Sequence, residues 1–78
     1  WQDWSVTPLL IERYRQETTD DYVRRRIIGF LIVASQASEQ ELNEQERAGV
    51  KLATTTVETI RIEDAGLYRR AEQGLIRR

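Results

Sequence analysis

The feature that most constrains this chain is a long run of apolar and small residues at helical spacing. Its members recur at intervals of three or four residues, with two adjacent pairs among them, which places them on one side of an α-helix. They are Val23, Ile27, Phe30, Leu31, Ala34, Ala37, Ser38 and Leu42. Asp20 and Asp21 precede the run and suit a helix N-terminus, because a carboxylate there accepts hydrogen bonds from free amides. We therefore predict one long helix over residues 20–47, which ends near Gly49.

A shorter helix is predicted before this run. Thr7 is a good N-cap residue, and Pro8 is favoured in the first turn because its missing N–H has no partner there. Leu10 and Tyr14 would share one face of the helix. We predict this helix over residues 8–17.

The region after Gly49 allows two interpretations. If it is a strand, strict alternation places Thr56, Glu58, Ile60 and Ile62 on one face. A helix that begins at Val57 explains more residues and runs further, so we favour it. Its apolar positions would be Val57, Ile60, Asp64 or Ala65, Tyr68, Ala71 and Leu75.

The same region contains Thr54, Thr55 and Thr56, which form helices poorly because their branched side chains are restricted. We therefore predict a loop over residues 48–56 and a helix over residues 57–77. Gly66 and Gly74 would weaken that helix, and closely packed neighbouring helices would explain them. The predicted fold is mainly α: a small helical bundle of a short helix, a long helix and a C-terminal helix. We expect residues 1–78 to form a single helical domain.

The chain contains no Cys and no His among its 78 residues. A chain of this size buries only about 60% of its unfolded surface, and it lacks both disulfides and the usual zinc ligands. Oligomerisation remains as a way to complete a thin core. The commonest general base and the commonest strong nucleophile are also missing. We therefore expect no enzyme activity, with no catalytic, cofactor-binding or metal-binding residues.

The acidic residues of the predicted long helix suggest no metal site either. Glu39, Glu41, Glu44 and Glu46 have no metal-loop spacing and are typical of a solvated helix face. No apolar run reaches the roughly 20 residues of a membrane-spanning helix, so we expect no membrane partner. The sequence also contains no Met. We expect the chain to belong to a longer gene product, or to have lost its initiator with any preceding residues.

Arginine dominates the basic residues. The net charge is −1, from 12 basic and 13 acidic residues, and Lys51 is the one lysine. The planar arginine fork suits carboxylates and protein interfaces, so salt bridges are favoured. The alternative is a small helical nucleic-acid-binding or regulatory module, which the near-zero net charge disfavours. It would use the arginine clusters Arg24, Arg25, Arg26, Arg69 and Arg70.

Two tryptophans precede the first predicted helix. Trp1 and Trp4 could anchor an interface, because tryptophan, tyrosine and arginine are enriched in binding hot spots. A core position for Trp4 is an equal alternative. The candidate partner-interface residues are Trp1, Trp4, Arg24, Arg25, Arg69 and Arg70.

Two segments carry a resemblance to a known family. The first is LLIERYRQETTDDYVRRRIIGFLIVASQASEQELNEQ, a short helix, a Thr/Asp break and a long helix with small residues that ends in a Glu-Leu pair. The second is LYRRAEQGLIRR, which bears Tyr and Arg on a final helix. Their order resembles the head-completion proteins of tailed phages with contractile tails, the gpL family. A related helical head–tail connector protein would have nearly the same physics.

The resemblance implies a non-enzymatic structural adaptor that joins the phage head to the tail. Such a protein would form a homo-oligomeric ring, bind the portal protein, and present a docking surface to neck or tail proteins. It would be assembled in the host cytoplasm and lie in the virion, at the head–tail interface. The arm that carries Trp1 and Trp4 would reach the portal or an adjacent copy. Arg and Glu side chains on the outer face of the long helix would pair between subunits.

Overall fold

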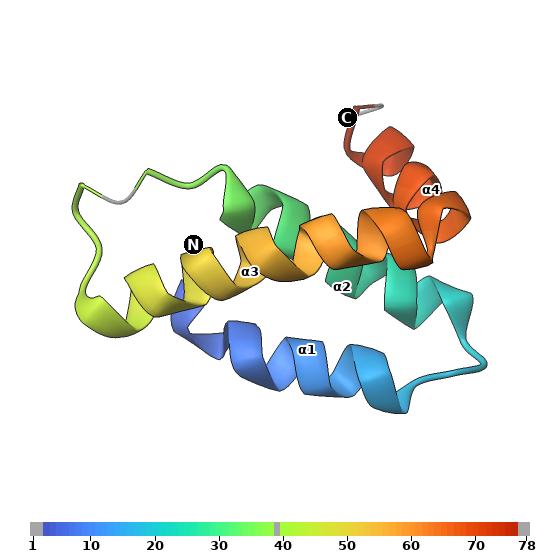
Figure 1. Cartoon of the computed structure of the whole chain (residues 1–78), viewed down its shortest axis with the longest axis horizontal. Coiled ribbons are helices and arrows are strands. Elements are labelled where there is room, and N and C mark those ends of the chain that lie inside the picture. The colour runs from blue at the N-terminus through green and yellow to red at the C-terminus, as the bar shows by residue number, and fades with distance from the viewer. Residues whose placement is uncertain (1–2, 39, 77–78) are drawn as a thin grey trace.

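A computed structural model describes residues 3–38 and 40–76, the last of these by its backbone alone. Within these ranges the chain forms four α-helices and a short 3-10 helix, with no strand (Figure 1). This confirms the predicted mainly α, small helical bundle. The elements are η1 (Trp4–Val6), α1 (Thr7–Gln16), α2 (Asp21–Ser35), α3 (Glu44–Glu63) and α4 (Ala65–Ile76).

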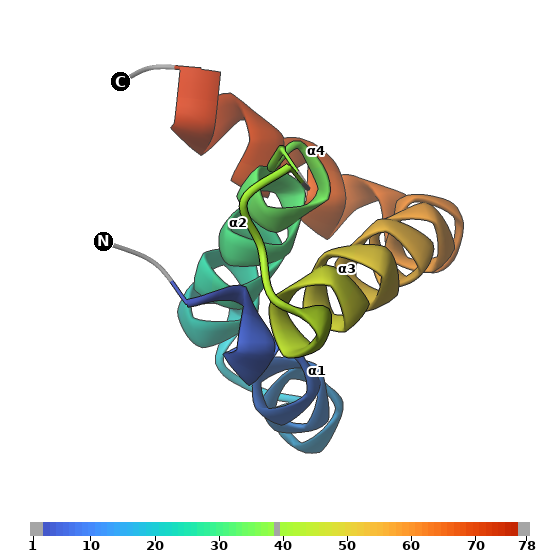
Figure 2. The same cartoon turned by 90° about the vertical axis from the view of Figure 1, so that its left-hand side faces the viewer.

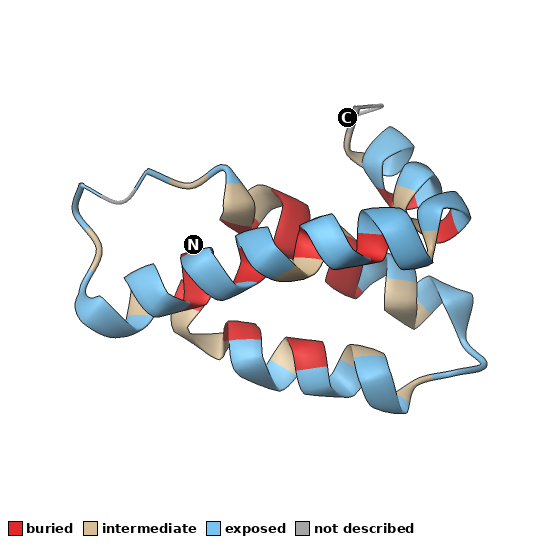
Figure 3. Ribbon diagram, in the orientation of Figure 1, coloured by how far each residue is buried: buried red, intermediate tan, exposed pale blue. Residues whose placement is uncertain are grey.

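The helices α1, α2 and α3 lie side by side, and successive helices run in opposite directions (Figure 1). Seen from the end, these three surround a common centre while α4 lies over α2 (Figure 2). The most extensive contact between two helices is that of α2 with α3, while α4 packs mainly on α2 and η1 packs mainly on α3. The faces turned towards one another are buried, whereas the outer faces of α1 and α3 are exposed (Figure 3). The buried apolar residues are Trp4, Ile11, Ile27, Ile28, Leu31, Ile32, Ala34, Val50, Ala53, Val57, Ile60, Leu67 and Ala71.

The first predicted helix is confirmed to within one residue at each end. Pro8 lies in its first turn, as expected. Thr7 is wholly buried and is the first residue of α1. Its hydroxyl donates a hydrogen bond of 2.6 Å to the backbone oxygen of Trp4. The threonine therefore ties η1 to α1.

The predicted long helix over residues 20–47 is wrong, because α2 ends at Ser35. The Gln36 amide donates a hydrogen bond to the carbonyl of Val33, three residues earlier, and this tighter turn ends the helix. Asn43 then starts α3 with a capping box: its side chain accepts from the Glu46 amide at 2.8 Å, and the Glu46 carboxylate accepts from the Asn43 amide. The chain thereby reverses and packs α3 against α2.

The predicted loop over residues 48–56 is also wrong, since all of these residues lie within α3. Thr54 and Thr55 donate hydrogen bonds to the carbonyls of Val50 and Lys51, one turn earlier. Apolar residues on the other side of α3 are buried, and their burial stabilises the helix by more than the weak helix preference of threonine opposes it. The strand interpretation fails for the same reason.

Gly49 does not end a helix but is buried inside α3. A methyl group at this position would overlap the backbone oxygen of Trp4 and lie 3.2 Å from the hydroxyl oxygen of Thr7. Close approach of η1 to α3 therefore requires glycine here.

The predicted helix over residues 57–77 is divided at Asp64. The Asp64 amide bonds to the carbonyl of Ile60 and closes α3, while its carbonyl accepts from the amide of Tyr68 and starts α4. The backbone of Asp64 itself is not helical, with φ −138° and ψ 55°. This bend turns α4 onto α2, so that Leu67 becomes buried and Ala65 is exposed.

Candidate functional site

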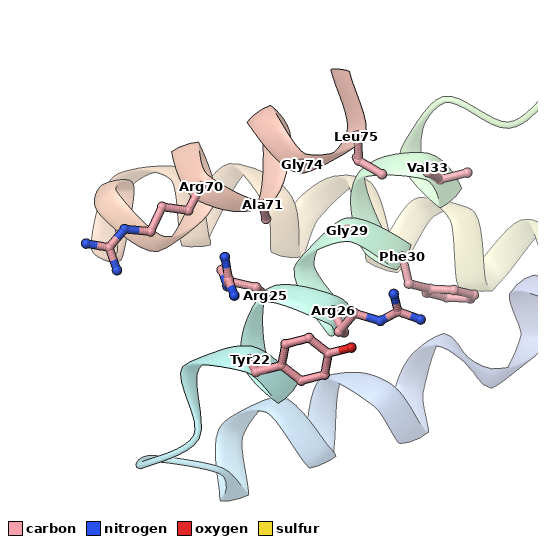
Figure 4. Close-up of a pocket in the computed structure, with 10 residues that line it drawn as sticks. All are labelled: Tyr22, Arg25, Arg26, Gly29, Phe30, Val33, Arg70, Ala71, Gly74 and Leu75. Carbon is pink, nitrogen blue, oxygen red and sulfur yellow. The ribbon is translucent and has the colours of Figure 1, made fainter. Parts of the chain in front are cut away.

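The main candidate site is a groove between α2 and α4, which we call the α2–α4 groove (Figure 4). It is an open hollow of about 340 Å³. Every residue that lines it belongs to one of these two helices. The lining residues are Tyr22, Arg25, Arg26, Gly29, Phe30, Val33, Arg70, Ala71, Gly74 and Leu75.

The groove follows from the way α4 packs on α2. Leu67 and Ala71 are buried from the α4 side, and Leu75 is half-buried. Gly29 and Gly74 have no side chain, so at these two positions only the helix backbone lines the groove. A methyl group at Gly29 would be 3.9 Å from a methyl carbon of Leu75, an ordinary contact. The two helices touch through their larger side chains and leave a hollow beside the glycines.

Gly66 and Gly74 do not have the closely packed neighbours that we predicted for them. A methyl group at either position would have no atom of the described chain within 4 Å, outside the glycine's own surroundings in the helix. Gly66 is in the first turn of α4 and Gly74 is in the last turn, but only Gly74 lines the groove. Packing among the described residues therefore does not explain glycine at position 74.

The rim of the groove is basic. Arg25 and Arg26 come from α2 and Arg70 comes from α4, and all three are exposed. In the view of Figure 4, Arg25 and Arg70 lie towards one end of the groove and the Arg26 side chain extends towards the other. No carboxylate is among the lining residues. Within the described residues, none of these three guanidinium groups forms an ion pair. The groove thus presents positive charge around an apolar floor.

Arg24, a predicted interface residue, is engaged inside the molecule. Its guanidinium group forms an ion pair of 3.2 Å with Asp64 and lies 4.6 Å from the centre of the Tyr14 ring. The Tyr14 hydroxyl donates to the same carboxylate oxygen of Asp64 at 3.3 Å. Burial raises the pKa of the Tyr14 phenol above its ordinary value, and the charge of Arg24 acts in the opposite direction. We call these three residues the Tyr14–Arg24–Asp64 cluster.

The remaining predicted interface residues lie in different places. Trp4 is buried, and its ring centre is 5.3 Å from that of Phe30, so the structure gives it the core position. Trp1 lies outside the described residues. Arg69 is exposed on α4 but does not line the groove. Of the six candidates, the groove brings together Arg25 and Arg70.

We did not predict several groove residues as interface residues, although their spacing along the sequence indicates a shared helix face. Tyr22, Arg26, Gly29 and Val33 follow each other at intervals of four, three and four residues, which defines a second stripe along α2. On α4, Arg70 and Gly74 are one turn apart. We predicted one stripe along α2, the more apolar one that forms the core, and did not consider this second stripe.

A second hollow is lined by the Tyr14–Arg24–Asp64 cluster together with residues of α1, of the turn after it and of α3. Threonines of α3 line one part of it, and Arg15, Glu17 and Glu63 supply charges of both signs. This mixed surface favours no one class of ligand.

Other classes of site find no support in the described part of the chain. Within residues 3–38 and 40–76, no group of three or more potential ligand residues could hold a metal ion. None of the described helices is long and apolar enough to cross a membrane. The chain matches no family model, no curated protein and no solved structure. Its function is therefore argued from the geometry of the α2–α4 groove.

Proposed function

We propose that this chain is a non-enzymatic structural adaptor that holds another protein against the face formed by α2 and α4. The observation that carries the proposal is the α2–α4 groove, with its apolar floor and the exposed side chains of Arg25, Arg26 and Arg70. Arginine and tyrosine are enriched in interface hot spots, where an apolar surface is buried beneath charged or polar groups. Tyr22, with 61% of its surface exposed, adds an aromatic side chain to the same face.

The resemblance to phage head-completion proteins suggests the setting in which such an adaptor works. In the structure, the stretch from Leu9 to Gln45 contains α1, α2, a turn and the start of α3. A short helix, a Thr/Asp break and a second helix follow one another as α1 and α2, but the Glu41-Leu42 pair lies after the end of α2. The Tyr68-Arg69-Arg70 sequence lies on α4. We propose that the chain forms a ring at the head–tail interface of a virion and binds the portal and neck or tail proteins.

A mass measurement tests this proposal. The purified chain would be analysed by sedimentation, alone and with a phage portal protein. The proposal predicts an oligomer, or a complex with the portal, whose formation depends on concentration. A strict monomer that ignores the portal would overturn it. Portal, capsid and tail genes next to this one would support it.

The second candidate function is nucleic-acid binding, favoured by the convergence of Arg25, Arg26 and Arg70 on one face. Arg24 is no longer available to it, because that side chain pairs with Asp64. The apolar floor and the net charge of −1 favour a protein partner. Nucleic-acid binding predicts an affinity for duplex DNA that falls steeply as salt rises. Absence of binding at low salt would exclude it.

A further inference from the structure

We infer that the α2–α4 groove binds an amphipathic α-helix of a partner protein, one with a short apolar stripe flanked by Asp or Glu. This inference rests on the proposed adaptor function and adds to it the chemistry of the partner. Three properties of the groove carry it: its size, its charge and the glycine at position 74.

The size of the groove limits what can enter. A volume of about 340 Å³ is at the lower end of the range for small-ligand pockets, and the hollow is open along one side. Such a groove holds a few apolar side chains but not a whole segment of chain. A helix that lies across it would insert residues one turn apart, as in other helix-in-groove complexes. Phe30, Val33 and Leu75 are half-buried in the free chain, and these inserted side chains would cover them.

The charge of the groove specifies the flanks of the partner helix. Arg25, Arg26 and Arg70 surround the floor from both helices, and no lining residue is acidic. Carboxylates of the partner would meet guanidinium groups, which bind them with paired hydrogen bonds. The Tyr22 side chain also lies on the rim, where its hydroxyl could donate to a further carboxylate. A basic helix would be repelled by the same groups.

Gly74 supplies the independent observation. It lies in the last turn of α4 and lines the groove, and no neighbouring atom of the described chain requires a glycine there. At a groove wall the missing side chain allows another backbone to come close. Gly66 is equally open but does not line the groove, so it serves as the matched control.

The experiment uses the full chain and a fluorescent, helix-stabilised peptide with leucines at i, i+3 and i+7 and glutamates on both flanks. A second peptide carries lysine in place of each glutamate. We expect the acidic peptide to bind at least about tenfold more tightly than the basic one, and less tightly as salt rises. Arg70→Ala should weaken this binding by about tenfold, whereas Arg69→Ala should leave it unchanged. Gly74→Leu should block the peptide, whereas Gly66→Leu should not.

Several outcomes would overturn the inference. Equal binding of the acidic and basic peptides would do so, as would equal effects of Arg69→Ala and Arg70→Ala. Duplex DNA that displaces the acidic peptide and binds more tightly would assign the groove to nucleic acid. Self-association that Arg70→Ala abolishes, with no peptide binding, would assign it to a second copy of this chain. If the protein binds the portal but not the acidic peptide, the proposed adaptor function stands and only the proposed chemistry of the partner helix is rejected.

Discussion

The backbone carbonyl of Trp4 lies directly against Gly49 of α3, with no room for a side chain between them. A methyl group at Gly49 would overlap the Trp4 carbonyl oxygen and lie 2.8 Å from the carbonyl carbon. The Thr7 hydroxyl donates to the same carbonyl, and the Trp4 ring packs on Phe30. These contacts fix η1 to both α3 and α2.

The contact predicts that Gly49→Ala destabilises the fold. Alanine is the better helix former by about 1 kcal/mol, so helix propensity alone would predict the opposite sign. Overlap with a backbone carbonyl forces η1 away from α3, and overpacking of this kind costs roughly 1–3 kcal/mol. We expect a lower free energy of unfolding in denaturant titrations. Gly66→Ala, at an open position, should be neutral or stabilising. Equal stability of the two variants would contradict the close contact.

Leu31 tests the phase of α2. Its side chain has no exposed surface, and substitution by alanine in such a position costs about 2–5 kcal/mol. We therefore expect Leu31→Ala to lower the free energy of unfolding by an amount in this range. Leu9 is 68% exposed, so Leu9→Ala should change stability by less than about 0.5 kcal/mol. Similar small losses of stability for both variants would show that a different face of α2 is buried.

The Arg24–Asp64 ion pair predicts a measurable coupling between α2 and the bend that separates α3 from α4. The two side chains are 22% and 34% exposed, which reduces the effect of solvent screening without removing it. A double-mutant cycle with Arg24→Ala and Asp64→Ala should give a coupling of roughly 0.5–1 kcal/mol. The Arg61–Glu58 pair is longer, at 4.0 Å, and more exposed, so its coupling should be close to zero. A larger coupling for this second pair would refute the internal role of Arg24.

The helical class and much of the core were predictable because burial repeats with the period of the helix. Ile27, Leu31 and Ala34 are buried as expected. Two boundaries were missed for different reasons. The Asn43 cap could have been predicted, because Glu46 follows it three residues later as in a capping box. We missed it because the apolar pattern of the preceding helix continues as far as Leu42. The threonines of α3 were judged by propensity, which burial of the opposite face overrides.

The bend at Asp64 could not be predicted locally. The side chain of Asp64 is held by Tyr14 and Arg24, which are distant in the sequence, while the apolar pattern of α3 and α4 also fits one continuous helix. The α2–α4 groove depends on this bend, because the bend lays α4 over α2. Arg25 and Arg70 were therefore predicted as separate candidates, because no local pattern indicates that they lie around one hollow.

Glu17 predicts how the stability of the chain changes in acid. Its carboxylate accepts hydrogen bonds from the amides of Asp20 and Thr19 and from the Thr19 hydroxyl, and it forms an ion pair of 3.1 Å with Arg13. These donors, led by the two amides, lower the pKa of Glu17 to about 2 from its ordinary 4.5. The carboxylate thus joins the end of α1 to the turn before α2.

A carboxyl whose pKa is lower in the folded chain stabilises the fold above its unfolded pKa, and this contribution is lost as the pH falls towards the folded value. For Glu17 the loss should occur as the pH falls from 4.5 to about 2. We expect Glu17→Gln to lower the melting temperature above this window, and to make it less dependent on pH within it. Melting curves followed by circular dichroism across this range measure both effects. Glu63→Gln, on the exposed side of α3, should retain the pH dependence of the parent chain. Parallel curves for Glu17→Gln and the parent would show that the turn does not hold this carboxylate.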